Sequence, residues 1–236
     1  MHATSGTHDM KVLLVDDDID LVDLLTYALR RAGYAVVTAL DGEQALQTWE
    51  AERPDMVLLD GVLPRLDGFE VCRRIRQQAR TPIILLTERS AEVEVVGGLE
   101  AGADDYVSKP FSAKQLLARM QAVLRRYEPE PEQLASPELR VGDLVLDPEG
   151  HQVTRAGRPI RLTRMEFRLL YRLALNAGQV IPHSRLIETT WGYYGDDGSA
   201  ELLKYHVTHL RKKLGLARNG PASIKVVVGV GYCLTR

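Results

Sequence analysis

Five short apolar runs, spaced along the first half of the chain, constrain the fold more than any other feature. Each run has three to five residues and precedes a segment with helical periodicity. Continuous apolar strands that alternate with helices predict an α/β fold, a doubly wound, five-stranded parallel sheet covered on both faces. The strands are expected at Lys11–Val15, Ala35–Ala39, Met56–Leu59, Pro82–Leu86 and Tyr106–Ser108, and the helices near 19–32, 41–52, 67–77, 91–101 and 112–126.

The pattern changes after residue 126. Residues 127–137 (YEPEPEQLASP) contain three prolines and three acidic residues, which predicts a linker. Beyond it we expect a small α+β domain of the winged helix-turn-helix type. Its signals are strands near 139–146 and 151–155, a hairpin cue at Ala156-Gly157, helices near 163–176 and 183–191, a third helix ending at Leu214, and a hairpin from 224–228 and 231–234. The predicted organisation is a flexible tail (1–10), a first domain (11–126), the linker (127–137) and a second domain (138–236).

The formal net charge of −2 conceals a difference between the two predicted domains. Residues 11–127 contain 15 Lys/Arg and 19 Asp/Glu, whereas residues 138–236 contain 15 Lys/Arg and nine Asp/Glu. An acidic first domain joined to a basic second domain favours a nucleic-acid partner for the second.

Several other classes of protein are disfavoured. The only cysteines, Cys72 and Cys233, can form neither a disulfide framework nor a metal site, which fits a reducing cytoplasm. No apolar run approaches the ~18 residues of a membrane span, and the first ten residues lack the apolar segment of a signal peptide. We therefore expect a cytoplasmic protein without a membrane partner.

Polar residues follow the predicted strands of the first domain at their carboxyl ends. Asp16 and Asp17 follow the first strand, Asp60 the third, Thr87 the fourth and Lys109 the fifth. The carboxyl ends of parallel strands share one edge of a sheet, so these side chains should converge. Three converging carboxylates need a cation, and ligation by oxygen alone suits Mg²⁺.

This set of residues is suited to phosphoryl transfer. A carboxylate beside Mg²⁺ can act as the nucleophile, and a lysine and a hydroxyl can neutralise the transferring group. Asp60 is the predicted nucleophile. A single aspartate after a strand is more often a turn former or a helix N-cap, which is our interpretation of Asp18 and Asp20. The prediction depends on the joint placement of the set.

Several strings resemble a known family. LLVDDD, DMVLLDGVLPRLDG, PIILLT and GADDYVSKPF resemble the receiver domain of two-component response regulators. LTRMEFRLL, HVTHLRKKLG and GVGYCL are similar to the DNA-binding domain of the OmpR/PhoB subfamily. The resemblance extends from Lys11 to Leu234 and implies a flavodoxin-like receiver followed by a winged-helix domain.

The resemblance implies roles for the residues at the sheet edge. Asp60 would accept a phosphoryl group from a sensor histidine kinase or a small acyl phosphate. Thr87 and Lys109 would contact the phosphoryl oxygens, Thr87 and Tyr106 would form the switch pair, and Lys109-Pro110 would be a cis peptide. The Mg²⁺ ligands would be Asp16, Asp17, Asp60 and the backbone carbonyl of Val62.

The resemblance also implies a homodimer of activated receivers. Four residues match positions that form ion pairs across a two-fold interface in the subfamily, namely Asp104, Asp105, Arg119 and Arg126. Trp191 and the loop Gly192–Ser199 match the region where relatives contact RNA polymerase.

The third helix of the basic domain has the periodicity of a DNA-reading helix. Its apolar residues recur at intervals of four, three and four residues, at Leu203, Val207, Leu210 and Leu214. The remaining faces are cationic and rich in hydrogen-bonding groups, as a helix in the major groove of double-stranded DNA would be. We assign Lys204, Thr208 and His209 to base edges and Arg211, Lys212 and Lys213 mainly to phosphates, with Tyr205 on the same outer face.

Two residues depart from the family pattern. Glu88 follows Thr87 where the family has a small residue, and a carboxylate there is hypothesised to slow phosphorylation. Val228 replaces an arginine that commonly enters the minor groove, so weaker minor-groove reading and a shallower salt dependence are hypothesised.

The sequence therefore predicts a transcription regulator controlled by phosphorylation rather than an enzyme. The activated dimer would bind tandem half-sites about one helical turn apart. Two alternatives stay open at this point. One is a phosphorylation-independent DNA-binding regulator with an atypical receiver. The other is a haloacid-dehalogenase-like phosphatase using Asp16-x-Asp18, which would leave the basic domain unexplained.

Overall fold

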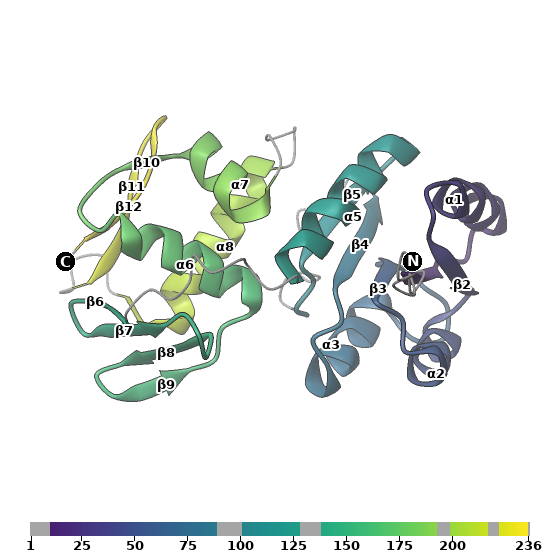
Figure 1. Cartoon of the computed structure of the whole chain (residues 1–236), viewed down its shortest axis with the longest axis horizontal. Coiled ribbons are helices and arrows are strands. Elements are labelled where there is room, and N and C mark those ends of the chain that lie inside the picture. Colours follow the sequence, from purple (N-terminus) through teal and green to yellow (C-terminus); the bar gives the residue numbers. More distant parts are fainter. Residues whose placement is uncertain (1–9, 89–100, 128–137, 193–198, 217–221, 236) are drawn as a thin grey trace, which may run out of the picture. The chain divides into compact units, whose positions relative to one another are not determined.

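The computed structural model describes residues 10–88, 101–127, 138–192, 199–216 and 222–235. The chain separates into two compact units, divided after Tyr127 (Figure 1). The predicted tail and linker fall almost wholly outside the described residues, as does nearly all of the helix expected near 91–101. No helix in the described ranges has the length and hydropathy needed to cross a membrane.

The first unit is built on one parallel sheet of five strands in the order β2-β1-β3-β4-β5. This confirms the predicted α/β class. The strands are β1 (Lys11–Val15), β2 (Ala35–Ala39), β3 (Met56–Asp60), β4 (Ile83–Glu88) and β5 (Asp105–Lys109), and the described helices are α1 (Ile19–Arg31), α2 (Gly42–Glu52), α3 (Gly68–Gln78) and α5 (Ala113–Tyr127). Because the order reverses at β1 and β3, the switch point where such sheets bind ligands lies at their carboxyl ends.

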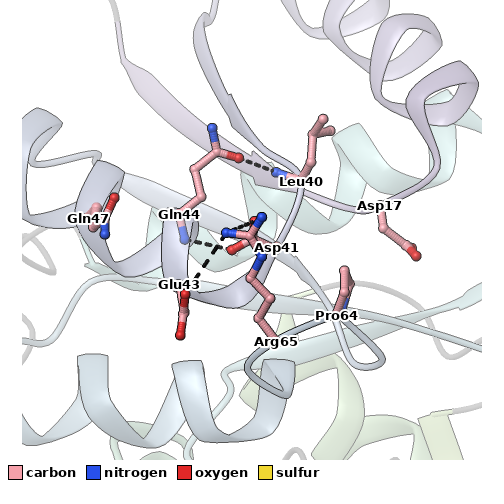
Figure 2. Close-up of a pocket in the computed structure, with 8 residues that line it drawn as sticks. All are labelled: Asp17, Leu40, Asp41, Glu43, Gln44, Gln47, Pro64 and Arg65. Atoms are coloured by element: carbon pink, nitrogen blue, oxygen red, sulfur yellow. Dashed lines mark hydrogen bonds and ion pairs between the residues drawn. The ribbon is translucent and has the colours of Figure 1, made fainter.

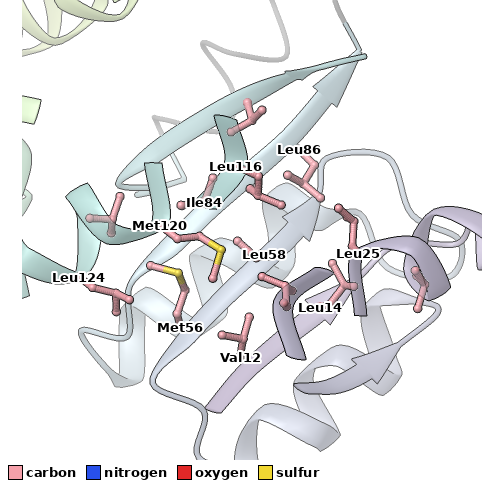
Figure 3. Packing of buried hydrophobic residues seen from close by; sticks show 14 residues of the cluster. Val12, Leu14, Leu25, Met56, Leu58, Ile84, Leu86, Leu116, Met120 and Leu124 are labelled. Carbon is pink, nitrogen blue, oxygen red and sulfur yellow. The ribbon is translucent and has the colours of Figure 1, made fainter. Parts of the chain in front are cut away.

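The core of this unit explains the apolar runs. Alternate strand residues, such as Leu14, Leu58 and Ile84, are fully buried on one face of the sheet against α1 and α5 (Figure 3). The residues between them, such as Leu13 and Leu85, are equally buried on the other face. Both faces of every central strand are therefore covered, which is why these strands show no polar alternation.

Aspartates begin three of the helices. The carboxylate of Asp18 accepts hydrogen bonds from the backbone N–H groups of Asp20 and Leu21 and caps α1. Asp41 caps α2 and Asp67 caps α3 in the same way. The N-cap interpretation of Asp18 is confirmed, which separates its role from that of Asp16. The same interpretation of Asp20 is wrong, because Asp20 lies inside the first turn of α1.

The start of α3 lies unusually close to the end of β3. The backbone N–H of Gly68 donates to the carbonyl of Gly61 at 3.2 Å. A Cβ atom at Gly68 would lie 1.9 Å from the carbonyl oxygen of Asp60. Only glycine therefore fits at this position without displacing the strand end that carries Asp60.

The second unit is the predicted α+β domain. In the described chain a four-stranded antiparallel sheet precedes three helices, and a three-stranded sheet in the order β10-β12-β11 combines a short strand between α6 and α7 with the C-terminal hairpin. The elements are β6 (Leu139–Val141), β7 (Leu144–Asp147), β8 (Gln152–Arg155), β9 (Arg158–Ile160), α6 (Arg164–Leu175), β10 (Ile181–Pro182), α7 (His183–Trp191), α8 (Ser199–Lys213), β11 (Ser223–Val227) and β12 (Gly231–Thr235).

The hairpin cue at Ala156-Gly157 is confirmed. Both residues have positive φ, 48° and 76°, which matches the twist needed in a two-residue turn between β8 and β9. The predicted apolar stripe of α8 is also confirmed, because Leu203, Val207, Leu210 and Leu214 are all buried.

Candidate functional sites

The predicted acidic residues meet at the carboxyl edge of the parallel sheet. Asp16 follows β1 and Asp60 ends β3, and these two strands are paired in register. One carboxylate oxygen from each of Asp16, Asp17 and Asp60 lies within 4.8 Å of the others. Asp16 and Asp60 are buried, whereas Asp17 is exposed. The geometry predicted from the strand ends is therefore present.

Lys109 joins the two buried carboxylates. Its Nζ donates to Oδ2 of Asp16 at 2.7 Å and to Oδ2 of Asp60 at 2.8 Å. The second oxygen of Asp60 accepts the backbone N–H of Val62 at 3.2 Å, and that of Asp16 accepts the N–H of Asp18 at 3.1 Å. The peptide bond from Lys109 to Pro110 is cis, as expected.

Burial dominates the electrostatics of this cluster. It raises the pKa of the Asp60 carboxyl, and the hydrogen bond from Lys109 only partly opposes this effect. Burial alone would lower the pKa of Lys109, but its bonds to Asp16 and Asp60 outweigh burial and raise that pKa overall. Lys109 therefore stays charged at neutral pH and screens the repulsion between Asp16 and Asp60.

Thr87 supplies a hydroxyl at the same edge. Its side chain is 1% exposed, and Oγ1 has no hydrogen-bond partner in the part of the chain that the structure describes. A buried hydroxyl without a partner is costly, so this group is available to a ligand. Tyr106 is buried in β5 opposite Leu85, and the exposed Glu88 lies opposite Lys109 in the register of β4 and β5.

The donor set fits the predicted Mg²⁺. The ion takes oxygen ligands and uses only one or two carboxylates with waters in many sites, and three carboxylates carry more negative charge here than Lys109 neutralises. Asp16, Asp17 and Asp60 can hold it.

A hollow of about 620 Å³ lies beside Asp17, between the loops after β2 and β3 (Figure 2). Arg65 reaches across it, with Nη1 at 3.4 Å from Oδ2 of Asp41 and 4.0 Å from Glu43. Arg65 has a φ of 65°, a left-handed conformation that is uncommon for an arginine. No periodic pattern in the sequence marks Arg65, a loop residue that pairs with Asp41 at the N-cap of α2.

The second unit presents the helix predicted to read DNA. Lys204, Thr208 and Lys212 of α8 are exposed, and Oγ1 of Thr208 donates to the carbonyl of Lys204 at 2.8 Å. The placement of Tyr205 on the outer face of the helix is wrong, because Tyr205 is buried and its ring stacks on His209 at a centroid distance of 4.0 Å. Opposite the buried stripe, the exposed side chains of α8 therefore include cations and a hydroxyl.

Comparisons with known proteins agree over nearly the whole chain. Residues 12–121 match the response regulator receiver domain, and residues 157–234 match the family described as transcriptional regulatory protein, C terminal. The DNA-binding response regulator MtrA of Mycolicibacterium smegmatis is 43% identical over 226 residues, which are 96% of this chain and 97% of MtrA. The response regulator MprA of Mycolicibacterium vanbaalenii is 45% identical over 227 residues, 95% of this chain and 97% of MprA.

A solved structure supports the same family. The response regulator DrrB of Thermotoga maritima, an OmpR/PhoB homologue, has 36% sequence identity and a TM-score of 0.51, and the match covers 97% of this chain and 100% of DrrB. This chain belongs to the OmpR/PhoB family of two-component response regulators. The regulator is thus a DNA-binding protein that controls transcription, and nothing in these comparisons supports the phosphatase or phosphorylation-independent alternatives.

The residues predicted for the regulator's dimer interface form ion pairs within the chain. Nη1 of Arg119 lies 2.8 Å from Oδ1 of Asp105, and Nη2 of Arg126 lies 3.9 Å from Oδ2. Asp104 accepts hydrogen bonds from Arg76, from the hydroxyl of Tyr127 at 2.8 Å and from the N–H of Ile83 at 2.9 Å. Their role across an interface between two chains stays a prediction.

Two of the cations assigned to phosphates have partners inside the regulator's second unit. Nε of Arg211 donates to the carbonyl of Ile224 at 2.9 Å, and its guanidinium lies 6.0 Å from the ring centroid of Tyr232. Nζ of Lys213 lies 2.7 Å from Oε2 of Glu166. Helical periodicity could not reveal these contacts, because it places residues on a face without showing what packs against that face.

The tip of the β11–β12 hairpin is apolar and open. Val228 is 89% exposed, and Val226, Val227 and Val230 beside it are also exposed. Trp191 is fully buried next to His206, with the ring centroids 5.3 Å apart. Most of the loop Gly192–Ser199, predicted to contact RNA polymerase, lies outside the described residues.

Replacing Asp60 by asparagine should stabilise the metal-free regulator at neutral pH. Burial raises the pKa of the Asp60 carboxyl, so folding favours its protonated form. Near pH 3, below the ordinary aspartate pKa of about 3.9, wild type and Asp60→Asn should have similar stability. As the pH rises through the folded-state pKa, wild type should lose stability relative to the variant.

Thermal unfolding of both proteins in a chelating buffer, between about pH 3 and about pH 7, measures this difference. A gap in Tm that stays constant, or that favours wild type at neutral pH, would contradict the assignment of burial as the dominant effect.

Proposed function

We propose that Mg²⁺-dependent phosphorylation of Asp60 switches the regulator into a dimer that binds DNA. The observation that carries this proposal is the position of Lys109, which lies between the carboxylates of Asp16 and Asp60 with the unpartnered hydroxyl of Thr87 at the same sheet edge. The phosphoryl donor is a sensor histidine kinase or a small acyl phosphate. The regulator turns over no external substrate and carries out chemistry only on its own aspartate.

The transfer follows from the nucleophile and its neighbours. An oxygen of the Asp60 carboxylate attacks the phosphorus atom, and the bond from phosphorus to the donor's nitrogen or oxygen breaks, with the electron pair leaving on that atom. The ammonium of Lys109 partly opposes the effect of burial on the pKa of the Asp60 carboxyl and attracts the incoming phosphoryl oxygens. Mg²⁺, held by Asp16, Asp17, Asp60 and the carbonyl of Val62, would supply the remaining neutralisation of charge.

The hydroxyl of Thr87 can couple phosphorylation of Asp60 to a change of conformation. Because Oγ1 has no partner within the described chain, a phosphoryl oxygen on Asp60 gives it an acceptor without the loss of an existing bond. Tyr106, on the neighbouring strand, completes the proposed switch pair. The two states then differ in whether Thr87 is satisfied, which provides the differential interaction a switch requires.

We propose that the activated regulator pairs through Asp104, Asp105, Arg119 and Arg126. Arg119 and Arg126 form ion pairs with Asp105 within one chain. Dimerisation would therefore replace these ion pairs by ion pairs to the partner chain, or extend them to it. All four side chains are buried within one chain, so the small contribution of exposed ion pairs does not apply to them, and we propose that they set the register of the pair.

In the second unit, α8 enters the major groove of double-stranded DNA. Lys204, Thr208 and His209 meet base edges and Lys212 meets phosphate, and two copies occupy tandem half-sites about one helical turn apart. Contact of the Trp191 region with RNA polymerase, and a cytoplasmic location where kinase and DNA are both accessible, complete the proposal.

The phosphorylation switch is tested by comparing wild type with Asp60→Asn. Oligomer mass by light scattering, and affinity for a duplex selected in vitro with wild type, are measured with and without beryllofluoride and Mg²⁺. Wild type should dimerise and bind at least about tenfold more tightly, a gain of about 1.4 kcal/mol, and Asp60→Asn should do neither.

Asp18→Asn is the matched control, because asparagine retains the N-cap of α1 while removing a neighbouring charge. It should respond like wild type. Equal oligomer mass and DNA affinity of wild type and Asp60→Asn under both conditions would contradict the proposal that phosphorylation of Asp60 controls the regulator.

Replacing Glu88 should speed phosphorylation of Asp60. Its carboxylate is exposed opposite Lys109 and adds negative charge near the approaching donor. The rate with acetyl phosphate should rise several-fold in both Glu88→Ala and the isosteric Glu88→Gln, because Coulomb repulsion falls with the charge. If only Glu88→Ala is faster, the cause is size rather than charge. If neither rate changes, Glu88 has no role in access to the site.

An arginine at Val228 should steepen the salt dependence of DNA binding. The position is at the open tip of the hairpin, and an added cation that contacts DNA steepens the slope of log K against log[salt] by about 0.9. Val228→Gln, uncharged, should leave the slope unchanged. Identical slopes for Val228→Arg and wild type would show that the hairpin tip does not approach DNA.

A further inference from the structure

The last turn of α8 and the two residues after it are attached to three other parts of the second unit. Arg211 donates to the carbonyl of Ile224 in β11 at 2.9 Å. Arg155 of β8 donates through Nη1 to the carbonyl of Leu214 at 2.6 Å and to that of Gly215 at 2.7 Å. Lys213 is the third attachment, through the carboxylate of Glu166 in α6. The end of the helix is therefore held from the sheet, from the hairpin and from α6.

Glu166 has two roles in this arrangement. It forms a capping box at the start of α6, in which Oε2 accepts the N–H of Thr163 at 2.7 Å and the N–H of Glu166 donates to Oγ1 of Thr163 at 3.3 Å. The same oxygen, Oε2, accepts Nζ of Lys213 at 2.7 Å. One carboxylate thus joins the first turn of α6 to the last turn of α8, 47 residues further along the chain.

Burial makes this attachment specific. The side chain of Glu166 is 4% exposed, and a buried carboxylate is costly unless hydrogen bonds and opposite charge compensate it. The N-terminus of α6 provides part of that compensation and the ammonium of Lys213 provides the rest. Lys213, whose side chain is 37% exposed, is therefore paired with Glu166, whereas the adjacent exposed Lys212 makes no contact of this kind in the described chain.

We propose that Glu166 is a positioning residue for DNA reading, and that it sets the orientation of α8 through Lys213. Lys213 then acts as an anchor of the helix rather than as a phosphate ligand, and Lys212 is the phosphate ligand of this turn. The proposal rests on the assignment of α8 as the DNA-reading helix.

The expected effect falls on sequence discrimination. Contacts to base edges require side chains placed to within about 0.5 Å, whereas phosphate contacts carry no sequence information and tolerate small shifts. Loosening one end of α8 should therefore reduce binding to the selected sequence and leave non-specific binding almost unchanged.

Three variants of the full chain separate the possible roles. Glu166→Gln retains the capping box, because glutamine serves at the same position, but removes the ion pair with Lys213. Lys213→Met removes the ion pair from the other side. Lys212→Met is the matched control, the same substitution one residue away at an exposed position. Affinities for the selected duplex and for a scrambled duplex are measured at several salt concentrations, together with Tm.

Glu166→Gln and Lys213→Met should each lower the ratio of the two affinities by about tenfold, which is at the low end of the cost of one mismatched base pair. Lys213→Met should retain the salt slope of wild type, and Glu166→Gln should retain or increase it. Lys212→Met should keep the ratio and lose about 0.9 from the slope. A purely structural role would lower Tm and leave the ratio unchanged, which would overturn the proposal.

A loss of slope in Lys213→Met equal to that in Lys212→Met would also overturn it, because Lys213 would then be a phosphate ligand. Should Glu166→Gln fail to fold, Lys213→Met decides alone, since its capping box is intact. If wild type itself does not discriminate between the duplexes, the assignment of α8 fails, and this outcome is distinct from unchanged ratios in the variants.

Discussion

The contact of Lys109 with Asp16 and Asp60 is the interaction on which the rest of the receiver depends. Two buried carboxylates at the ends of neighbouring strands repel each other, and the ammonium at 2.7 and 2.8 Å makes their juxtaposition tolerable. The parallel sheet allows this contact, because it places the carboxyl ends of β1, β3 and β5 on the same side of the sheet although they are far apart in the sequence. Burial then leaves Asp60 under electrostatic strain, which a divalent cation or a covalent modification can relieve.

Much of the fold could be predicted, and the failures have physical causes. The bounds of β1 and β2 match the prediction because these strands consist mostly of apolar residues with clear ends. β4 and β5 extend further than predicted, since the polar residues at their ends, such as Glu88 and Lys109, continue the hydrogen-bonded ladder. β9 and β10 have only three and two residues, too few to show periodicity.

The candidate sites also contain features that the sequence predicts and features that it does not. The convergence of Asp16, Asp60 and Lys109 follows from strand ends alone, so the sequence was sufficient to predict it. The internal partners of Arg211 and Lys213 could not be predicted, because they depend on packing between residues 13 and 47 positions apart. The spacing of Thr163 and Glu166 does signal a capping box, but nothing in the sequence indicates that its carboxylate also binds a lysine of another helix.

The close approach of Gly68 to the carbonyl of Asp60 has a consequence for how natural variation in this regulator is interpreted. Gly68 is proposed to touch neither phosphate nor metal, yet this position is restricted to glycine by the space available, as Asp60 is restricted by its proposed chemistry. A survey of inactivating alleles would therefore rank position 68 beside position 60, although one reports on chemistry and the other only on the space available to a backbone. Intolerance to substitution at this edge of the sheet is thus no measure of participation in signalling.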